Sequence, residues 1–349
     1  MAEINQAEQQ NPSILWKHRN AIEEALMSMV SSDDLNLKSM LRYHMGWEDQ
    51  HGNSTVSGTG KGLRSSLRGY ACEAEGGTSS LSLSLAASVE LIHNFSLIHD
   101  DIQDEDTERR HRPTLWSIWG KPMALQAGNV LRVLADMGPQ QLDQNEVEPD
   151  VLASYSKILT TACLEIIEGQ FLDLSFEGKT DIGIPKYIDM ITRKTGALIR
   201  SAMHLGAISG TNNPRDIESL ANCGHYLGLL FQIRDDYLGI WGSDKETGKP
   251  TGSDIIRKKN SLPLVYGLER ADEQLKRRIR QIYSQVDIQS DDVDMVIGLL
   301  EDTKAPEYVN KLALENANKA RKAIEHVPLI PGAYADLEEL LDFLLNRQS

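Results

Sequence analysis

Apolar residues recur at three- and four-residue spacing along most of this chain, which is the spacing of an amphipathic α-helix. Alternation of apolar and polar residues with β-branched enrichment, the pattern of a strand, is nearly absent. The pattern therefore predicts an all-α protein, a single large helical bundle. The clearest helices are expected at Leu81–Asp104, Val151–Leu174, Ile188–Ile208, Leu220–Trp241 and Leu337–Leu345.

Clusters of Gly, Pro, Asn, Asp and Ser separate these helices and predict loops. The chain has no internal repeat and no low-complexity linker that would divide it. We therefore expect residues 13–349 to form one domain, of roughly ten or more helices, with residues 1–12 as a disordered N-terminus. Loops are expected at His51–Gly60, Gly138–Asp150, Gly178–Pro185, Gly210–Pro214 and Gly242–Ser253.

The composition is that of an ordinary globular protein, with 40% apolar and 25% charged residues. A net charge of −15 and a pI near 5.1 argue against a nucleic-acid partner. The N-terminus lacks the pattern of a signal or transit peptide, and no apolar run is long enough for a transmembrane segment. A cytoplasmic location is expected, with Cys72, Cys163 and Cys223 as buried thiols in a reducing compartment.

Two aspartate pairs lie far apart in the chain, each in a predicted helix. Asp100 and Asp101 are followed by Asp104, and Asp235 and Asp236 form the second pair. Neighbouring carboxylates on one helix repel each other, so a chain that repeats the arrangement has a use for it. Oxygen ligands suit Mg2+, which binds through a few carboxylates and substrate phosphates. The pairs therefore predict a phosphate-bearing substrate held with metal between two helices.

Basic residues and glycines accompany both pairs. Arg109, Arg110 and Arg112 follow the first pair, and guanidinium groups match phosphate geometry. A glycine-rich segment with Lys249 and Lys259 follows the second, but its spacing fits no Walker A loop. Alone, the first segment is equally compatible with a solvated charged surface, and the glycine-rich segment alone is better explained as an ordinary surface loop. Only their combination favours a substrate site.

At these motifs the chain resembles the trans-isoprenyl diphosphate synthases of the polyprenyl synthetase family. DDIQD resembles the first aspartate-rich motif of that family, DDxxD, and ERRHRPT resembles its RRGxPT continuation. The segments FQIRDD, TGKPTGSD and KKNSLP follow in the order of the family, and GQFLDL and RKTGAL match its GQxxD and KT segments. Upstream, GKGLRS resembles GKRLRP. The resemblance covers the chain from about Lys61 to the last helix.

The resemblance implies an all-α bundle around a deep central cavity, a homodimer, and head-to-tail transfer of a prenyl group. An allylic diphosphate ionises with the help of Mg2+, and isopentenyl diphosphate attacks the allylic carbocation. Three Mg2+ ions are implied, with Mn2+ as the alternative ion. Such an enzyme of short-chain type makes geranylgeranyl or farnesyl diphosphate.

The resemblance also assigns roles to individual residues. The metal ligands are Asp100, Asp101, Asp104 and Asp235, with Asp236 assisting. The isopentenyl diphosphate site is Lys61, Arg64, His93 and Arg110. The allylic diphosphate site is Arg109, Lys194, Lys249 and Lys259, and the groups near the developing cation are Thr195 and Gln232.

Several positions depart from the family pattern. Gly62 and Ser65 replace the first arginine and the proline of GKRLRP, and the AGD motif ends in Asn129. The second aspartate motif reads DDYLG, so that Gly239 stands where a third aspartate is expected. The departure at Gly239 keeps a weakly active or non-catalytic subunit open as an alternative. A class I terpene cyclase is a further alternative, but its second metal motif is of the NDxxSxxxE kind.

Product length is predicted from the residues before the first motif. Phe95 lies five residues before Asp100 and Ser96 lies four before it. In the family, this combination resembles the type that makes the C20 product, whereas two adjacent aromatic residues resemble the C15 type. On an ideal helix Ser96 shares the face of Asp100, but Phe95 lies to the side and needs help from a neighbouring helix to close a tunnel. We predict geranylgeranyl diphosphate, with farnesyl diphosphate as the alternative.

Overall fold

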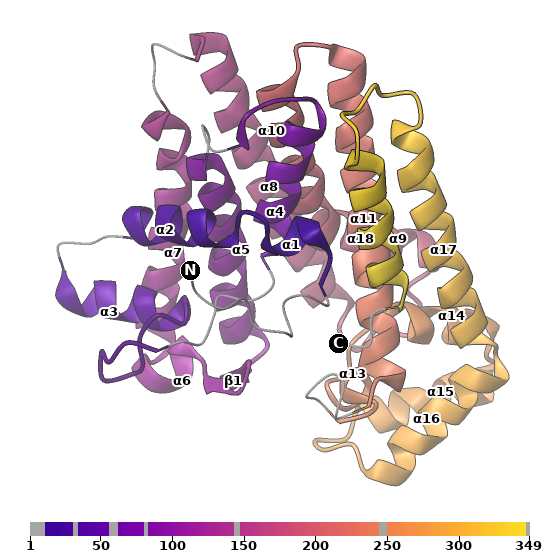
Figure 1. The fold of residues 1–349 in the computed structure, drawn as a ribbon. Helices are drawn as coiled ribbons and strands as arrows, with labels where there is room; N and C mark the ends of the chain where they lie inside the picture. Colours follow the sequence, from indigo (N-terminus) through magenta and orange to yellow (C-terminus); the bar gives the residue numbers. More distant parts are fainter. Residues whose placement is uncertain are drawn as a thin grey trace. The chain divides into compact units, whose positions relative to one another are not determined.

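The structure, a computed structural model, describes residues 11–30, 34–55, 62–79, 83–142, 147–243 and 250–346. Helices form nearly all the regular structure in these ranges, as the periodicity predicts (Figure 1). Two predicted site residues, Lys61 and Lys249, lie outside them. No helix within the described ranges is long and apolar enough to cross a membrane.

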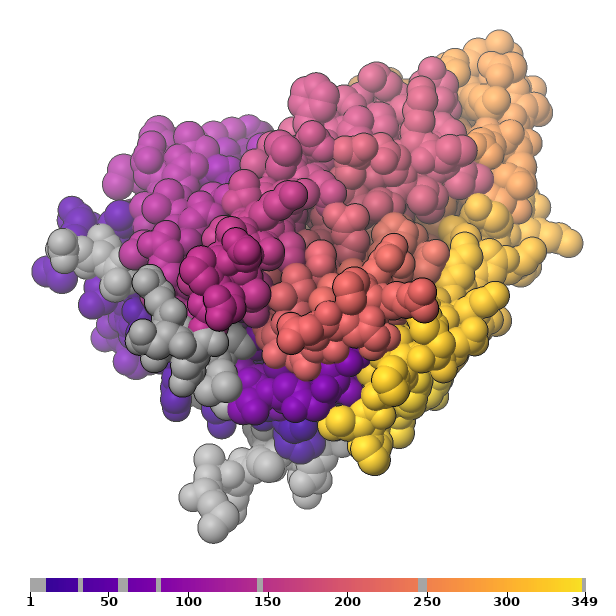
Figure 2. Space-filling view, turned by 90° about the horizontal axis from the view of Figure 1, so that it is seen from above, coloured from indigo at the N-terminus to yellow at the C-terminus, as the bar shows by residue number. Residues whose placement is uncertain are grey.

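Contacts between α-carbons divide the chain into two units. The first unit comprises Met1–Leu164, Ser201–Ala221 and Val327–Leu337; the second comprises Glu165–Arg200, Asn222–His326 and Glu338–Ser349. Four helices have residues in both: α8 (Pro149–Phe176), α10 (Ala197–Gly210), α11 (Pro214–Trp241) and α18 (Ala333–Asn346). The C-terminal helices are exposed in yellow on the face shown in Figure 2.

The first unit is organised around α5. Helix α5 spans Leu83–Gln103, and the other elements of the unit are α1 (Ser13–Trp16), α2 (Arg19–Met29), α3 (Leu35–His44), α4 (Leu63–Ala74), β1 (Glu108–Arg109), β2 (Arg112–Pro113), α6 (Leu115–Trp119), α7 (Lys121–Met137) and the short 3-10 helix η3 (Pro139–Gln141). Helix α5 packs against α2, α4 and α7. Small residues such as Ala86 and Ala87, both almost fully buried, let its neighbours approach closely. The packing fixes the C-terminal end of α5, where Asp100 and Asp101 lie.

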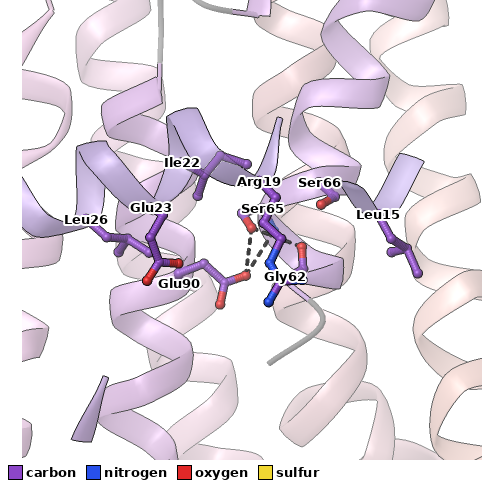
Figure 3. A pocket seen from close by; sticks show the side chains of 9 residues that line it. All are labelled: Leu15, Arg19, Ile22, Glu23, Leu26, Gly62, Ser65, Ser66 and Glu90. Atoms are coloured by element: carbon purple, nitrogen blue, oxygen red, sulfur yellow. Dashed lines mark hydrogen bonds between the residues drawn. The ribbon is translucent and has the colours of Figure 1, made fainter. Parts of the chain in front are cut away.

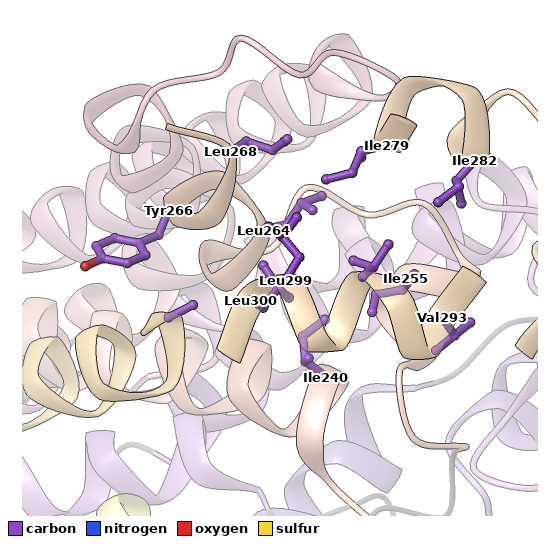
Figure 4. Packing of buried hydrophobic residues seen from close by; sticks show 12 residues of the cluster. Ile240, Ile255, Leu264, Tyr266, Leu268, Ile279, Ile282, Val293, Leu299 and Leu300 are labelled. Carbon is purple, nitrogen blue, oxygen red and sulfur yellow. The ribbon is translucent and has the colours of Figure 1, made fainter. Parts of the chain in front are cut away.

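The second unit contains α9 (Ile184–Ile191), η4 (Thr192–Gly196), α13 (Ser253–Ile256), α14 (Leu262–Arg270), α15 (Glu273–Tyr283), α16 (Ser290–Asp302) and α17 (Ala305–Ile324). Its apolar cluster includes Ile240 of α11, Ile255 of α13, Leu264 of α14 and Ile279 of α15 (Figure 4). Each of these side chains is at most 1% exposed. Full burial of one such side chain stabilises the fold by roughly 1.5–3 kcal/mol, so the four-residue helix α13 is held firmly beside α11.

Three details differ from the sequence-based expectation. The predicted helix Ile188–Ile208 is interrupted by η4, a turn of π-helix between α9 and α10. The predicted loop at Gly138–Asp150 contains η3 and the first residues of α8. A two-stranded antiparallel hairpin, β1–β2, follows α5, where no strand was expected. The three cysteines are buried and free, as predicted.

Candidate active site

The first aspartate pair has one accessible and one buried member. Asp101 is only 3% exposed and accepts a hydrogen bond from Arg109 Nε at 2.7 Å. Burial raises the pKa of Asp101 to about 6, although the Arg109 guanidinium opposes the shift. Asp100 and Asp104, one helical turn apart, are partly exposed. The different environments follow from helix geometry, because consecutive residues point about 100° apart.

The arginines that follow lie on the β1–β2 hairpin. Arg109 pairs with Arg112 across the hairpin, so Arg110 and His111 form a two-residue turn. Both turn residues have positive φ, 54° and 60° respectively, as a type I′ turn requires. His111 stands where the motif of the family has glycine, the residue that tolerates this backbone best.

A cavity of about 140 Å3 lies between α3, α5 and the hairpin. Its wall includes His44, Asn94 and Asp101 and the three hairpin arginines Arg109, Arg110 and Arg112. The Nε2 atom of His44 is buried and has no hydrogen-bond partner. Burial, reinforced by the nearby arginines, lowers the pKa of His44 to about 3, so the imidazole is neutral at neutral pH.

His93 is also neutral. Its Nε2 lies 3.3 Å from Arg64 Nη1, and since a guanidinium only donates, the ring nitrogen is the acceptor. Burial, followed by Arg64, Arg110 and Arg109, lowers the pKa of His93 well below its ordinary value. His93, Arg64 and Arg110, assigned to one diphosphate by resemblance, therefore lie within electrostatic range of one another.

Two residues that depart from the family pattern, Gly62 and Ser65, lie at the start of α4. Gly62 adopts a left-handed conformation, with φ 58°, just before the helix. The Ser65 amide and hydroxyl both donate to Glu90 Oε1, at 3.2 and 2.9 Å. Figure 3 shows these bonds beside a small cavity that is also lined by Arg19. A proline at position 65 has no amide hydrogen, so the Ser65–Glu90 pair is a feature of this chain.

Phe95 and Ser96 precede the first pair on α5. Phe95 is 6% exposed, and its ring packs edge-on against His99 with the centroids 4.7 Å apart. His99 in turn lies against Gly128 of α7, where an added Cβ would come within 2.5 Å of His99 Nε2. Ser96 Oγ donates to the carbonyl of His93. Phe95 therefore packs on His99 of its own helix, and His99 in turn lies against α7.

The second aspartate pair repeats the pattern of the first. Asp235 is exposed, whereas Asp236 is 4% exposed. Asp236 accepts hydrogen bonds from the Tyr187 hydroxyl, Gln232 Nε2 at 2.9 Å and the Leu262 amide at 3.0 Å. Burial raises the pKa of Asp236 to about 7 against the effect of these donors. In both pairs, the first acid is more exposed than the second, and the second is buried and accepts hydrogen bonds from neighbouring side chains.

The π-helical turn η4 orients Lys194 and Thr195. Lys194 Nζ contacts Asp173 Oδ2 at 2.5 Å, and Thr195 Oγ1 donates to Gln232 Oε1 at 2.7 Å. Neighbouring helices approach the turn at Gly169, where an added Cβ would lie 2.2 Å from the Lys194 amide nitrogen. Such single π turns occur often at functional sites.

Another acid occupies the space beside Gly239, the position where the family pattern has a third aspartate. An added Cβ at Gly239 would lie 2.2 Å from Asp254 Oδ2, so the Asp254 carboxylate occupies that space. Asp254 belongs to α13, and its carbonyl accepts from the Lys259 amide at 2.9 Å. Asp254 also acts on Asp236, since its charge contributes to raising the pKa of that residue.

Among the residues with described positions, no group of three His, Cys, Asp or Glu side chains is placed to hold a metal ion. Mg2+ needs no such cage, because it binds through one or two carboxylates together with waters and substrate phosphates. Carboxylate oxygens of this kind are offered by Asp100 together with Asp104, and separately by Asp235. The residues present therefore fit a Mg2+–diphosphate complex better than a permanently bound ion.

Comparison with known proteins decides the family. The family model described as polyprenyl synthetase matches residues 47–300, which include residues of both units. The chain belongs to the polyprenyl synthetase family. It is a prenyltransferase of the short-chain trans-prenyl diphosphate synthase class. Members of this family use Mg2+ with isopentenyl and allylic diphosphate substrates.

Individual relatives align with this chain over nearly its whole length. The chain is 36% identical over 335 residues to a short chain isoprenyl diphosphate synthase of Methanothermobacter thermautotrophicus, covering 96% of this chain and 98% of that one. It is 32% identical over 340 residues to a (2E,6E)-farnesyl diphosphate synthase of Mycobacterium bovis, covering 96% and 93%. The crystal structure of geranylgeranyl pyrophosphate synthetase from Pyrococcus horikoshii Ot3 superposes with a TM-score of 0.87 at 33% identity, covering 98% and 100%. Relatives with both product lengths are therefore similar to this synthetase.

Reasoning from the sequence missed five residues of the site in this synthetase. Two of them stand in motifs already noted, Asp173 in GQFLDL and Asp254 in TGSD, so a signal for them was present. His44 and Tyr187 lie outside the motifs, and nothing in the sequence marks them. Arg112 was noted as basic, but its contacts to α3, described below, depend on the fold.

Proposed function

We propose that this synthetase condenses isopentenyl diphosphate with an allylic diphosphate to make geranylgeranyl diphosphate. The observation that carries the proposal is the shared design of the two aspartate pairs. Asp101 and Asp236 are buried and hydrogen-bonded, while Asp100 and Asp235 are left accessible on the same helices. Buried acids of this kind hold the cationic and amide groups around them, and we assign metal binding to the more exposed acids.

The metal ligands in this proposal are Asp100, Asp104 and Asp235. Bound Mg2+ supplies Lewis acidity to the leaving diphosphate. Asp101 fixes Arg109 beside the ligands, and Asp236 fixes Gln232. Three ions are proposed, with Mn2+ as a substitute for Mg2+.

Basic residues divide between the two substrates. The allylic diphosphate is proposed to bind to Arg109, Lys194 and Lys259, which stabilise its charge as the C–O bond breaks. Lys249, which lies outside the described residues, is proposed to bind it too. Arg64 and Arg110, with His93, are proposed to bind isopentenyl diphosphate, as is Lys61, which also lies outside the described residues. His93 contributes by accepting from Arg64, which orients the guanidinium.

Thr195 and Gln232 are proposed to lie beside the allylic cation. The Thr195 hydroxyl donates to Gln232 Oε1, and Gln232 Nε2 donates to Asp236. This chain of bonds fixes the side-chain amide of Gln232, so its oxygen is preorganised as a partial negative charge. The electron pair of the broken C–O bond leaves with the diphosphate, the alkene of isopentenyl diphosphate attacks the cation, and a proton is then lost.

Phe95 and Ser96 support the C20 product over the C15 product. A small residue at position 96 lets a growing chain pass, and Phe95 is backed by His99 and Gly128. Each added methylene gains about 0.8 kcal/mol of burial, so length is set by steric closure rather than by falling affinity. Farnesyl diphosphate is the second candidate product.

An active enzyme is favoured over a non-catalytic subunit because Asp254 fills the space at Gly239 with a carboxylate. The metal side of the second motif therefore retains its negative charge. A terpene cyclase is disfavoured because the basic groups proposed for a second diphosphate, Arg64 and Arg110 among them, have no use in that reaction.

We further propose that the two units form one catalytic domain, that the enzyme is a homodimer and that it is cytoplasmic. Ile167 and Phe171, one turn apart on α8, are 50% and 71% exposed, which is unusual for large apolar residues in a chain of net charge −15. A second copy would bury them. Replacing both with Glu should give monomers by mass measurement; dimers that persist would place the interface elsewhere.

The test of the metal and substrate roles is thermal stabilisation by a non-hydrolysable allylic diphosphate analogue. We expect a rise in Tm with Mg2+ present and none with EDTA. The Asp100→Asn and Asp235→Asn variants should each lose the rise in Tm that depends on Mg2+. A rise that is the same without metal would contradict the assignment of these acids.

A further inference from the structure

Arg112 ties the basic hairpin to the end of helix α3. Its Nη1 donates to the Tyr43 carbonyl at 3.1 Å, and its Nη2 donates to the Glu48 carbonyl at 2.7 Å. The guanidinium also stacks on the Tyr43 ring, 4.2 Å from the centroid. These contacts join positions 64 and 69 residues apart in the chain.

Tyr43 completes the connection from the other side. Its hydroxyl donates to the Pro113 carbonyl at 2.8 Å, so the last turn of α3 and strand β2 are joined by bonds in both directions. Tyr43 is 5% exposed and also packs edge-on against Trp119 of α6. Figure 1 shows the hairpin and α6 beside α3 at one end of the first unit. We call the Arg112–Tyr43 pair the α3 latch.

The chemistry of the latch suits arginine specifically. The last carbonyls of a helix have no partner within the helix, and a cation there also faces the negative end of the helix dipole. The planar fork of arginine reaches two carbonyls at once and stacks on an aromatic ring, whereas lysine offers one compact charge.

The α3 latch bonds strand β2 to the end of α3. The cavity of about 140 Å3 lies between α3, α5 and the hairpin, so packed side chains do not fill the space. The turn itself is strained, with Arg110 and His111 both at positive φ. Strand β1 is bonded to α5 through Arg109 and Asp101, whereas Arg112 and Tyr43 bond β2 to α3. The base of the hairpin is closed separately, by Thr114 Oγ1 and Trp116 Nε1, which both donate to the Asp106 carbonyl.

We propose that Arg112 is a positioning residue for isopentenyl diphosphate, acting through the α3 latch to hold Arg110. The proposal rests on the proposed function, which gives Arg110 that substrate. The latch also reaches the segment after α3, because Arg112 Nη2 donates to the Glu48 carbonyl. It therefore joins strand β2, which follows Arg110 in the hairpin, to the end of α3 and to the residues after that helix.

The test is steady-state kinetics of Arg112→Gln with each substrate varied in turn. We expect the KM for isopentenyl diphosphate to rise about tenfold, the equivalent of losing one hydrogen bond to a charged group. The KM for the allylic diphosphate should change by less than about twofold, since Asp101 still holds Arg109. Arg112→Lys should recover only part of the loss, because it cannot reach both carbonyls.

Two further variants keep the test decisive. Tyr43→Phe removes only the bond to Pro113 and should raise the same KM by a smaller factor, even if Arg112→Gln folds poorly. Arg278→Gln, which removes an exposed arginine paired with Asp292, is the matched control and should leave both KM values unchanged.

The outcomes separate the latch from the proposed function. If the unmodified enzyme elongates no allylic diphosphate, the proposed function fails. If it is active and the Arg112 and Tyr43 variants lower only Tm, or raise both KM values equally, the latch is structural and the inference is overturned.

Discussion

The carboxylate of Asp254 lies against the α-carbon of Gly239, so close that a Cβ at Gly239 would come within 2.2 Å of Asp254 Oδ2. An aspartate at position 239 would therefore need the space that the Asp254 side chain of α13 occupies. Gly239 creates the room in which Asp254 sits beside the site.

The first prediction is that restoring the missing aspartate lowers activity. In Gly239→Asp the new side chain displaces Asp254 and brings a second negative charge beside it, which costs about 1–3 kcal/mol of stability through overpacking. We expect lower kcat and a lower Tm. The double variant Gly239→Asp with Asp254→Ala should recover much of both, because one carboxylate again occupies the space.

Gly239→Ala is the control for backbone effects. Alanine in a helix interior normally stabilises by about 0.5–1 kcal/mol relative to glycine. A loss of stability at this position would therefore report the clash with Asp254. If Gly239→Asp is more active than the parent enzyme, Gly239 is a defect and our interpretation of Asp254 is wrong.

The second prediction concerns His111, which adopts φ 60° in the hairpin turn. His111→Gly should raise the free energy of unfolding by about 1 kcal/mol, because glycine adopts this conformation without strain. His111→Ala removes the same imidazole and keeps the strain, so it should give no gain. Urea unfolding of the three proteins measures the difference, and equal stability of the Gly and Ala variants would show that the backbone is not strained.

The third prediction is a pH dependence of stability that arises from His44. The pKa of His44 falls from 6.5 to about 3 on folding, because burial and the arginines disfavour its charged form. Between these values the unfolded chain binds a proton that the folded protein does not bind. The free energy of unfolding should therefore fall as the pH decreases below 6.5, by at most ~1.4 kcal/mol per pH unit from this residue.

His44→Gln should reduce that slope when unfolding is measured at pH 7 and at pH 5. Substitution of the exposed His51 by Gln is the control, with no reduction expected. An unchanged slope in His44→Gln would mean that His44 is protonated in the folded protein near pH 6.

The fourth prediction concerns product length. Phe95→Ala should give products longer than C20, and His99→Ala should lengthen them in part, because His99 supports the Phe95 ring. Ser96→Phe should shorten the product toward C15. Ser96→Ala keeps a small residue and should leave the profile unchanged. Chromatography of the prenyl products measures all four, and an unchanged profile in Phe95→Ala would remove Phe95 from the floor of the tunnel.

Local patterns in the sequence predicted the helices well. The expected helix at Leu220–Trp241 is α11, and the expected helix at Leu81–Asp104 corresponds to α5, since helical periodicity is a property of neighbouring residues. The roles of the two aspartates in a pair were harder to predict. The amide that binds Asp236 belongs to Leu262, 26 residues later in the chain, and only the packed fold brings them together.

The π turn at Thr192–Gly196 and the α3 latch were beyond prediction for related reasons. A single inserted residue leaves helical periodicity almost unchanged, so the apolar pattern cannot distinguish a π turn from a continuous helix. In the sequence, Arg112 is one basic residue among several. Its proposed role depends on a carbonyl at the end of α3, which only the fold brings close to it.

The most direct test of the account is product analysis with the purified full-length protein. The protein is incubated with Mg2+, labelled isopentenyl diphosphate and, in separate reactions, dimethylallyl, geranyl or farnesyl diphosphate. We predict that geranylgeranyl diphosphate accumulates as the longest main product and that EDTA abolishes its formation. Absence of any product longer than the primer would contradict the proposed activity, and a product that stops at C15 would contradict the proposed length.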